Sequence, residues 1–437
     1  MDPVMIGYLG AGLLFVLLAL GIPVGVAMGV IGVGGMLIGA GEALTFGQLQ
    51  TLPFAVVNNY AFAVLPMFVL MGVLAEAAGL TSQIFHTADL WLRRFRGGLY
   101  QAVIVGSAVF AAISGSTIVN AVVFTRIAFP EMLRFGYSKR LSIGAIAGAG
   151  SFAAMIPPSI TMVIYAILTE QSVGQLLVAG IIPGIVTAVV YLVGVYVLVR
   201  IRPNLAPPID VAVKTAERWR ALGQISPIAL LMMLVLGGIY TGLFPPSAAG
   251  SAGAFGAFCI AVYRKRTLKS WLIPSLQDAA SISCIIFVIL IGGLLLSRML
   301  VVVGAIDDMV VQITSIASTP LIFMVMASLL FIVLGCFLDT TSMMVVTLPF
   351  LFPVVVALEI DPIWFGIVLV KLIEISVITP PVGINLFAVL GAAGNRASFH
   401  DVALGVVPFI FFDLIVLALL IMFPELATWL PNQMIAG

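Results

Sequence analysis

The sequence predicts an all-α, polytopic membrane protein made of two repeats of inverted topology. Of its 437 residues, 62% are hydrophobic and only 8% are charged, and the mean hydropathy is +1.26. Charged residues make up about 25% of a typical soluble protein. Apolar segments recur from residue 4 to residue 428, so the chain leaves no room for a soluble domain of useful size.

The first half, residues 1–202, is expected to contain five spans and one re-entrant hairpin. Apolar runs predict spans at 4–20, 23–40, 61–80, 141–169 and 175–199, with an interfacial segment at 44–58. The run at 141–169 contains Pro157 and Pro158. Two consecutive prolines remove two backbone donors and disfavour helix at the residue before them. We therefore expect this helix to be broken near the middle of the membrane.

A re-entrant helical hairpin is predicted at about 101–130, because basic residues flank this apolar stretch on both sides. Arg and Lys collect on the cytoplasmic side of short membrane loops, so the chain should enter and leave by the same face. The interval of about 37 residues is too short for two full spans of about 20 residues with a turn and flanks. Its polar centre, Ser114–Thr117, should form the tip and line a polar cavity, since backbone exposed at membrane depth must line a cavity or be buried in protein. The flanking basic residues are Arg93, Arg94, Arg96, Arg134, Lys139 and Arg140.

Residues 203–223 are the most polar stretch and are expected to form a cytoplasmic linker before the second half, residues 224–437. Spans are predicted in this half at 225–243, 246–263, 276–298, 362–394 and 401–428, with a segment along the outer interface at 304–318. A second hairpin is predicted at about 320–356, where no basic residue flanks either end, as expected for entry from outside. The run at 362–394 contains Pro380 and Pro381, which predict a second broken helix.

The two halves align without a gap at an offset of 223 residues. Such structural repeats are common in transporters, where they place binding sites near the membrane midplane at paired broken helices. Because each half has an odd number of full crossings, the second half should be inverted relative to the first. The matched positions are Pro23 with Pro246, Pro130 with Pro353, Pro157 with Pro380, Pro158 with Pro381, and Ser116–Thr117 with Asp339–Thr340.

The polar hairpin tips and the proline breaks indicate sites for a monovalent cation and for an anion. Unwound carbonyls and helix C-termini supply oxygen ligands for Na⁺, which is the only metal expected. The N-termini of half-helices attract anions. The ligands expected in the first half are Ser114, Gly115, Ser116, Asn120, Gly150, Ser151 and Pro157. Those in the second half are Asp339, Thr340, Thr341, Ser342, Thr379, Val382 and Gly383. An anionic substrate is expected between the two tips, at Ser116, Thr117, Ser159, Arg298, Asp339 and Asn385.

Several acidic and basic side chains also allow a structural interpretation. A carboxylate at bilayer depth, such as that of Asp339, costs at least about 2.5 kcal/mol unless it is paired or solvated. Its role is either in ion or substrate binding or as a helix N-cap that accepts the backbone N–H of Thr341 or Ser342. Arg298 either snorkels to the interface or contacts a substrate carboxylate. Glu374 is either a hydrogen-bonded structural acid or a coupling group. Positions at the interface are expected for Glu42, Glu76 and Asp413.

Three motifs follow one another along the chain: Ala111-Ala-Ile-Ser-Gly-Ser-Thr117, Gly335-Cys-Phe-Leu-Asp-Thr-Thr341 and Thr379-Pro-Pro-Val-Gly383. Together they resemble the large membrane subunit of tripartite ATP-independent periplasmic (TRAP) transporters, and the resemblance covers essentially the whole chain. It implies a sodium-driven elevator carrier in the bacterial inner membrane that takes up small organic acids carrying a carboxylate. It also implies two partners, a small four-helix membrane subunit and a secreted periplasmic substrate-binding protein. Since the chain begins directly at the first span, the small subunit is expected as a separate polypeptide, and both termini are expected in the periplasm.

The alternative to this carrier is a stand-alone sodium–dicarboxylate symporter or an ion antiporter of related hairpin architecture. An enzyme is not expected, because His86 and His400 lie near predicted loops and no HExxH motif occurs. No G-x-x-x-x-G-K-[ST] motif occurs, which argues against ATP hydrolysis by this chain. No cofactor is expected. No nucleic-acid partner is expected either, since the net charge of +1 gives no indication of nucleic-acid binding.

Overall fold

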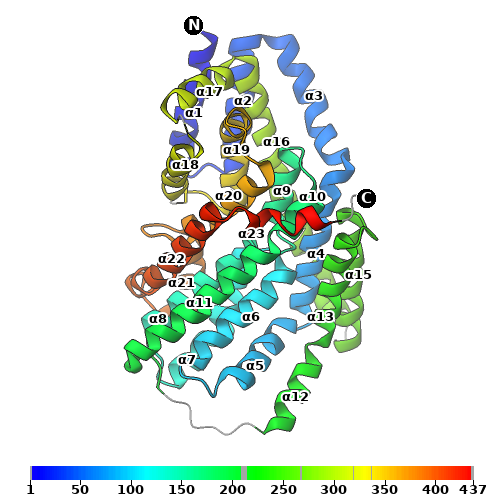
Figure 1. Ribbon diagram of the computed structural model, residues 1–437. Helices are drawn as coiled ribbons and strands as arrows, with labels where there is room; N and C mark the ends of the chain where they lie inside the picture. Colours follow the sequence, from blue (N-terminus) through cyan, green and yellow to red (C-terminus); the bar gives the residue numbers. More distant parts are fainter. Residues whose placement is uncertain (1, 208–213, 266–267, 318, 336, 435–437) are drawn as a thin grey trace.

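The computed structural model describes residues 2–207, 214–265, 268–317, 319–335 and 337–434. Within these ranges all regular secondary structure is helical, as predicted, and the helices form one bundle (Figure 1). Six of the described helices are long and apolar enough to cross a membrane, or up to eight if two bent pairs each count as one span. Not all ten predicted crossings reach this length, because α1 and α2 have only 17 residues each and two others are broken.

The helices before the first hairpin follow the predicted apolar runs. The apolar pattern does not predict α5, a separate helix whose Asp89 forms an ion pair with Arg93 at its C-terminal end. The segment at 44–58 forms the helix α3, and its position at an interface stays a prediction. The bounds are α1 (Pro3–Ala19), α2 (Val24–Ala40), α3 (Glu42–Asn58), the 3₁₀ turn Tyr60–Ala63, α4 (Val64–Ala77) and α5 (Leu80–Leu92).

At the first predicted hairpin the structure has two helices, α6 (Gly98–Ser114) and α7 (Thr117–Arg134), which contact each other. The chain reverses at Gly115, whose φ of 59° lies in the left-handed region that glycine adopts without a steric penalty. Ser116 then caps α7, with its hydroxyl accepting the backbone N–H of Val119 at 3.5 Å. Entry and exit by the same membrane face stays a prediction.

The helical segment that contains the first double proline is interrupted in the structure. The segment begins as α8 (Lys139–Gly150) and tightens into the 3₁₀ turn η2 (Ser151–Ala154). A cis peptide bond joins Pro157 and Pro158, and the chain resumes as α9. The remaining helices of this half are α9 (Ile160–Leu168), α10 (Val173–Ala179) and α11 (Ile181–Ile201).

Part of the predicted linker, residues 203–223, is helical. Residues 208–213 lie outside the described residues, but its last part forms the helix α12 (Thr215–Gln224). This helix packs on α5: the indole N–H of Trp91 donates to the carbonyl of Arg218, and the Arg218 guanidinium donates to the carbonyl of Leu90, at 3.2 and 3.1 Å. The polar composition of residues 203–223 does not predict this helix. The surface of α5 that it packs on lies more than 120 residues away in the sequence.

The second half repeats the order of hairpin, broken helix and final span. The predicted span at 276–298 belongs to a longer helix of 35 residues, α16, and the predicted span at 401–428 ends earlier, at Met422. A short helix, α23, follows Pro424. A second cis bond, between Pro380 and Pro381, breaks the helix predicted at 362–394. The bounds are α13 (Ser226–Met232), a π-turn (Met233–Gly237), α14 (Gly238–Tyr240), α15 (Pro246–Arg264), α16 (Leu268–Val302), α17 (Ala305–Ile316), α18 (Pro320–Leu334), α19 (Thr340–Ala357), α20 (Pro362–Ile378), α21 (Ile384–Ala393), α22 (Phe399–Met422) and α23 (Glu425–Thr428).

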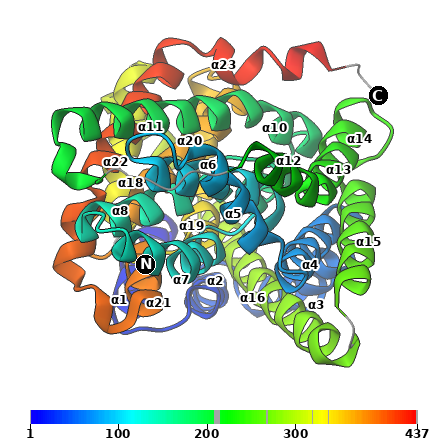
Figure 2. The ribbon, with the colours of Figure 1, turned by 90° about the horizontal axis from the view of Figure 1, so that it is seen from below.

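Helices of the two halves pack against each other rather than within separate domains. α2 lies along α16, α4 lies along α15, and α8 lies along α22 (Figures 1 and 2). The backbones come very close where glycines face each other: a Cβ on Gly292 would lie 2.0 Å from the carbonyl oxygen of Gly25. A Cβ on Gly405 would lie 2.0 Å from the carbonyl oxygen of Arg140. Small residues permit this approach between membrane helices, where packing and not water exclusion drives association.

Candidate functional site

The two hairpin tips, far apart in the sequence, line one pocket of about 430 Å³. Gly115–Val119 contribute from the first tip and Asp339–Thr341 from the second. This pocket lies where an anionic substrate is expected, between the two tips. The other lining residues are Ile160, Thr161, Ile282, Ile285, Ile286, Ile289 and Ile384.

Four helices begin at this pocket. Thr117, Ile160, Thr340 and Ile384 line it, and each is the first residue of its helix: α7, α9, α19 and α21. The first backbone N–H groups of a helix have no partner within that helix. Together with the helix dipole they give each N-terminus about half a positive elementary charge. The four N-termini therefore contribute positive potential at a pocket whose lining contains one carboxylate, that of Asp339, and no Lys or Arg.

Asp339 caps α19, as one of its two predicted interpretations requires. One carboxylate oxygen accepts the backbone N–H of Thr341 at 3.0 Å, and the other accepts the hydroxyl of Ser342. The side chain is half-buried and still borders the pocket. The cap thus holds a carboxylate at the second tip, in the pocket that the first tip also lines.

In the first half the hairpin tip lies against the proline break. A Cβ on Gly115 would lie 3.0 Å from the carbonyl oxygen of Pro158. The hydroxyl of Ser114 and the side-chain oxygen of Asn120 are buried without a hydrogen-bond partner, while the Asn120 amide donates to the carbonyl of Ser107 at 3.2 Å. These two oxygens remain available to a cation.

Two further predicted ligands of the first half are already engaged elsewhere. Gly150 packs on Ala121, where a Cβ would lie 2.7 Å away, and the Ser151 hydroxyl donates to the carbonyl of Gly148 at 2.8 Å. Both lie beside α7 rather than at its tip. Pro157 is the residue before Pro158, whose carbonyl oxygen lies next to Gly115.

In the second half, carbonyl groups gather around Gly383. A Cβ there would lie 2.9 Å from the carbonyl oxygen of Val377 and 3.0 Å from that of Thr379, and φ is +43°. The Thr379 hydroxyl donates back to the carbonyl of Ile375 at 2.6 Å. Asn385 is fully buried, and neither atom of its amide has a partner. Val382, between the cis bond and this cluster, is half-buried.

The chain matches, over residues 11–426, the family described as tripartite ATP-independent periplasmic transporter, DctM component. It belongs to this TRAP large-permease family. The C4-dicarboxylate TRAP transporter large permease of Vibrio cholerae is 31% identical over 97% of this chain and 98% of its own length. The sialic acid TRAP large permease of the same organism is 27% identical over 96% of both chains. These relatives are transporter permeases and not enzymes.

The TRAP permease also resembles known membrane transporters in fold. The crystal structure of the Alcanivorax borkumensis YdaH transporter aligns over 97% of this chain and 98% of that one, with a TM-score of 0.65 and 16% identity. This likeness concerns the fold alone. The apolar helices and the family membership together indicate a multi-pass protein of the inner membrane.

Three of the side chains predicted to contact substrate do not line this pocket. Arg298, on α16, is exposed and does not border it. Ser159 is buried where it caps α9, its hydroxyl donating to the carbonyl of Ala154 and accepting the backbone N–H of Met162. Asn385 lies one residue inside α21 and is enclosed by protein. Ser116, Thr117 and Asp339 do border the pocket.

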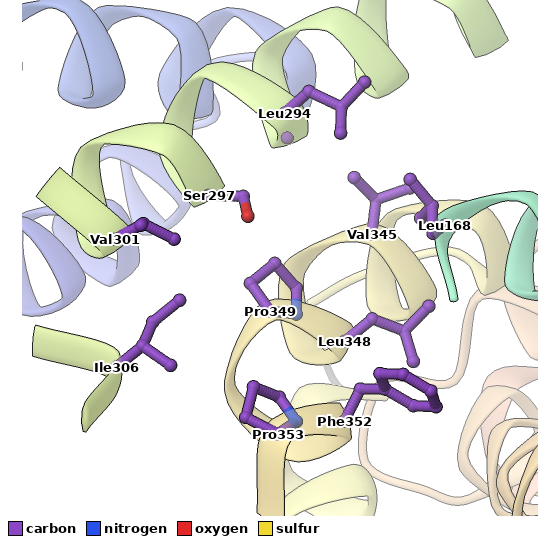
Figure 3. A pocket seen from close by; sticks show the side chains of 11 residues that line it. Leu168, Leu294, Ser297, Val301, Ile306, Val345, Leu348, Pro349, Phe352 and Pro353 are labelled. Carbon is purple, nitrogen blue, oxygen red and sulfur yellow. The ribbon is translucent and has the colours of Figure 1, made fainter. Parts of the chain in front are cut away.

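A second cavity, of about 280 Å³, lies between α16, α17 and α19 (Figure 3). Ser297 is the only lining residue with a polar side chain. The other labelled side chains around it are aliphatic, proline or phenylalanine. This lining offers a carboxylate a single side-chain donor, the Ser297 hydroxyl, so we assign the polar chemistry to the pocket between the tips.

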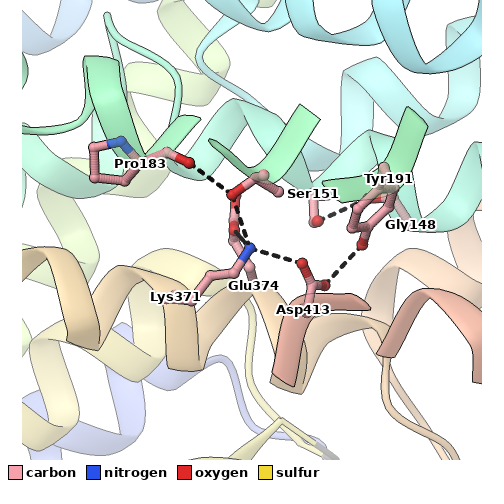
Figure 4. A network of polar contacts seen from close by, with 8 residues as sticks. Gly148, Ser151, Pro183, Tyr191, Lys371, Glu374 and Asp413 are labelled. Carbon is pink, nitrogen blue, oxygen red and sulfur yellow. Dashed lines mark hydrogen bonds and ion pairs between the residues drawn. The ribbon is translucent and has the colours of Figure 1, made fainter. Parts of the chain in front are cut away.

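One polar cluster was missed by the sequence reasoning (Figure 4). The Lys371 ammonium contacts Glu374 at 2.8 Å and Asp413 at 2.7 Å, and the Tyr191 hydroxyl donates to Asp413 at 2.8 Å. All four side chains are fully buried. The prediction of an interfacial Asp413 is wrong, because Lys371 compensates its charge in the protein interior. Lys371 and Glu374, three residues apart in an apolar run, were the available signal.

Proposed function

We propose that this chain is the membrane carrier of a TRAP system that uses a sodium gradient to take up a small carboxylate across the bacterial inner membrane. The observation that carries the proposal is the convergence of four helix N-termini on the pocket between the hairpin tips. Helix N-termini bind carboxylates through free backbone N–H groups and the helix dipole. A pocket of about 430 Å³ suits a small acid.

A bound sodium ion would compensate the negative charge of the Asp339 carboxylate at this pocket. The Asp339 carboxylate borders the same space as the incoming acid, and two carboxylates at close range repel each other. A cation bound nearby would offset this repulsion, so that ion and substrate bind more strongly together than separately. Carbonyl oxygens at broken helices coordinate Na⁺ in other secondary transporters.

The proposed ligands come from both halves of the chain. In the first half they are the tip and break residues, with the free oxygens of Ser114 and Asn120 as the best placed side chains. In the second half they are the carbonyls around Gly383 together with the tip that Asp339 caps. The repeated order of hairpin and double-proline break supports the proposed inverted repeat, in which the hairpins and broken helices would move together in an elevator-type transition.

The substrate class follows from chemistry that the relatives share. Two of them are named for C4-dicarboxylates and sialic acid, which carry carboxylates, and a third for isethionate, which is a sulfonate, so all three names denote organic anions and the first two denote carboxylates. We propose that the carrier receives its acid from a periplasmic binding protein and works with a small membrane subunit. We also propose that both termini face the periplasm.

Uptake by proteoliposomes tests this function. The carrier would be reconstituted with its small subunit, and labelled succinate, sialic acid and isethionate would be offered in turn with the binding protein and an inward sodium gradient. Accumulation of at least one acid, lost when the gradient is collapsed, is expected. Uptake that is indifferent to sodium would overturn the coupling. Equal uptake without the binding protein would favour the stand-alone symporter instead.

A further inference from the structure

The cluster around Lys371 joins three helices inside the protein. Lys371 and Glu374 lie on α20, Asp413 on α22, and Tyr191 and Thr187 on α11. The Lys371 ammonium contacts Glu374, Asp413 and the Thr187 hydroxyl at 2.8, 2.7 and 3.3 Å (Figure 4). None of the five side chains is more than 1% exposed.

The charges in this cluster do not balance. One ammonium faces two carboxylates, which leaves one net negative charge in a fully buried place if both acids are ionised. An uncompensated charge in the protein interior is strongly unfavourable. Because the cluster is enclosed, the smallest compensating ion is a proton.

The hydrogen bonds identify the oxygen that can carry it. Both oxygens of Asp413 are engaged, one by Lys371 and the other by the Tyr191 hydroxyl. One oxygen of Glu374, Oε2, accepts from Lys371. The other, Oε1, is buried and has no hydrogen-bond partner.

Glu374 lies between the two proline breaks. α20 packs on η2, the 3₁₀ turn that precedes the first proline break. On its own helix Glu374 precedes Thr379 by five residues. Among the described residues, the charged groups that act on Glu374 are Lys371 and Asp413, and Tyr191 is hydrogen-bonded to Asp413. The turn η2 carries no titratable side chain.

We propose that Glu374 is a proton-binding site that exchanges against cation occupancy of the breaks. With the breaks empty, Oε1 holds a proton and the cluster is neutral. When a cation binds at a break, the proton leaves to solvent and the cation compensates the carboxylate left behind. The exchange rests on the proposed sodium coupling, whereas the proton site itself does not.

Infrared difference spectroscopy on the full-length carrier tests the proton site without using transport. At neutral pH and without sodium, a carbonyl band of a protonated carboxylic acid is expected that shifts when glutamate, but not aspartate, carries a ¹³C carboxyl. Glu374→Gln should abolish the band, and Glu42→Gln, an exposed position, should retain it. A band that follows aspartate labelling, one that survives Glu374→Gln, or no such band would overturn the proposal. The labelling arm needs no variant, so it holds even if Glu374→Gln does not fold.

A second readout addresses the exchange. In the wild-type carrier the half-saturating sodium concentration should rise as pH falls, up to the limit of about tenfold per pH unit for one competing proton. In Glu374→Gln this dependence should disappear. The same pH dependence in both proteins would overturn the exchange. Uptake that needs no sodium at all would refute the coupling and leave the infrared result standing.

Discussion

Replacing Lys371 by methionine should lower the free energy of unfolding by about 3–5 kcal/mol, the usual cost of leaving one partner of a buried ion pair unpaired. The upper end is expected, because the ammonium contacts two carboxylates and a hydroxyl at 2.7 to 3.3 Å and no side chain in the cluster is exposed. After substitution, Asp413 keeps only the Tyr191 hydroxyl. Methionine fills a similar volume, so the loss reports charge and not a cavity.

Reversible unfolding in mixed micelles with increasing SDS measures this quantity. Lys265→Met, at an exposed position, is the matched control and should change stability by no more than about 0.5 kcal/mol. The double variant Lys371→Met/Asp413→Asn should recover most of the loss, because replacing a buried ion pair by neutral groups is often tolerated. A single variant Lys371→Met that unfolds within about 1 kcal/mol of the wild type would refute the charge compensation argued from the structure.

Three further predictions follow from other parts of the fold. Asp339→Ala should destabilise the protein by about 1 kcal/mol through loss of a helix cap, whereas Asp339→Asn should keep the cap and stability but raise the sodium concentration for half-maximal uptake; unchanged sodium dependence would leave Asp339 a cap alone. Gly405→Ala should lower the thermal unfolding midpoint, since its Cβ would lie 2.0 Å from a carbonyl oxygen of α8, while Gly12→Ala, which meets nothing within 4 Å, should not. Cysteines placed at Arg96 and Lys139 should both be labelled from the cytoplasmic side; labelling from opposite sides would turn the first hairpin into a pair of spans.

The two hairpins and the two broken helices were predictable, because their signals are local. A Gly–Ser tip between apolar runs and two adjacent prolines act on the backbone within a few residues. The predicted tips therefore match the structure at Gly115 and Asp339. The convergence of four helix N-termini could be predicted only in part. The sequence indicates where each helix begins, but not that the four N-termini line one pocket.

The buried ion cluster could not be predicted in the same way, because its partners lie far apart in the chain. Asp413 follows Lys371 by 42 residues, and Tyr191 precedes Asp413 by 222. Whether a charged residue inside an apolar run lies in the protein interior or at the interface cannot be predicted until its partner is known. The helix α12 shows the same limit, since its polar sequence forms a helix against α5 through contacts more than 120 residues away.

The close contact between α2 and α16 has a consequence for biosynthesis. α2 leaves the ribosome early, but the glycine face that α16 covers has no permanent neighbour until about 230 residues later. At a synthesis rate of about 5–20 residues per second, that interval lasts roughly ten seconds to a minute. During it, Gly25 and the small residues that follow on α2 must face lipid, neighbouring nascent helices or the insertion machinery. The contact between α2 and α16 therefore forms late, and a chain stalled before α16 would expose the face of α2 that α16 later covers.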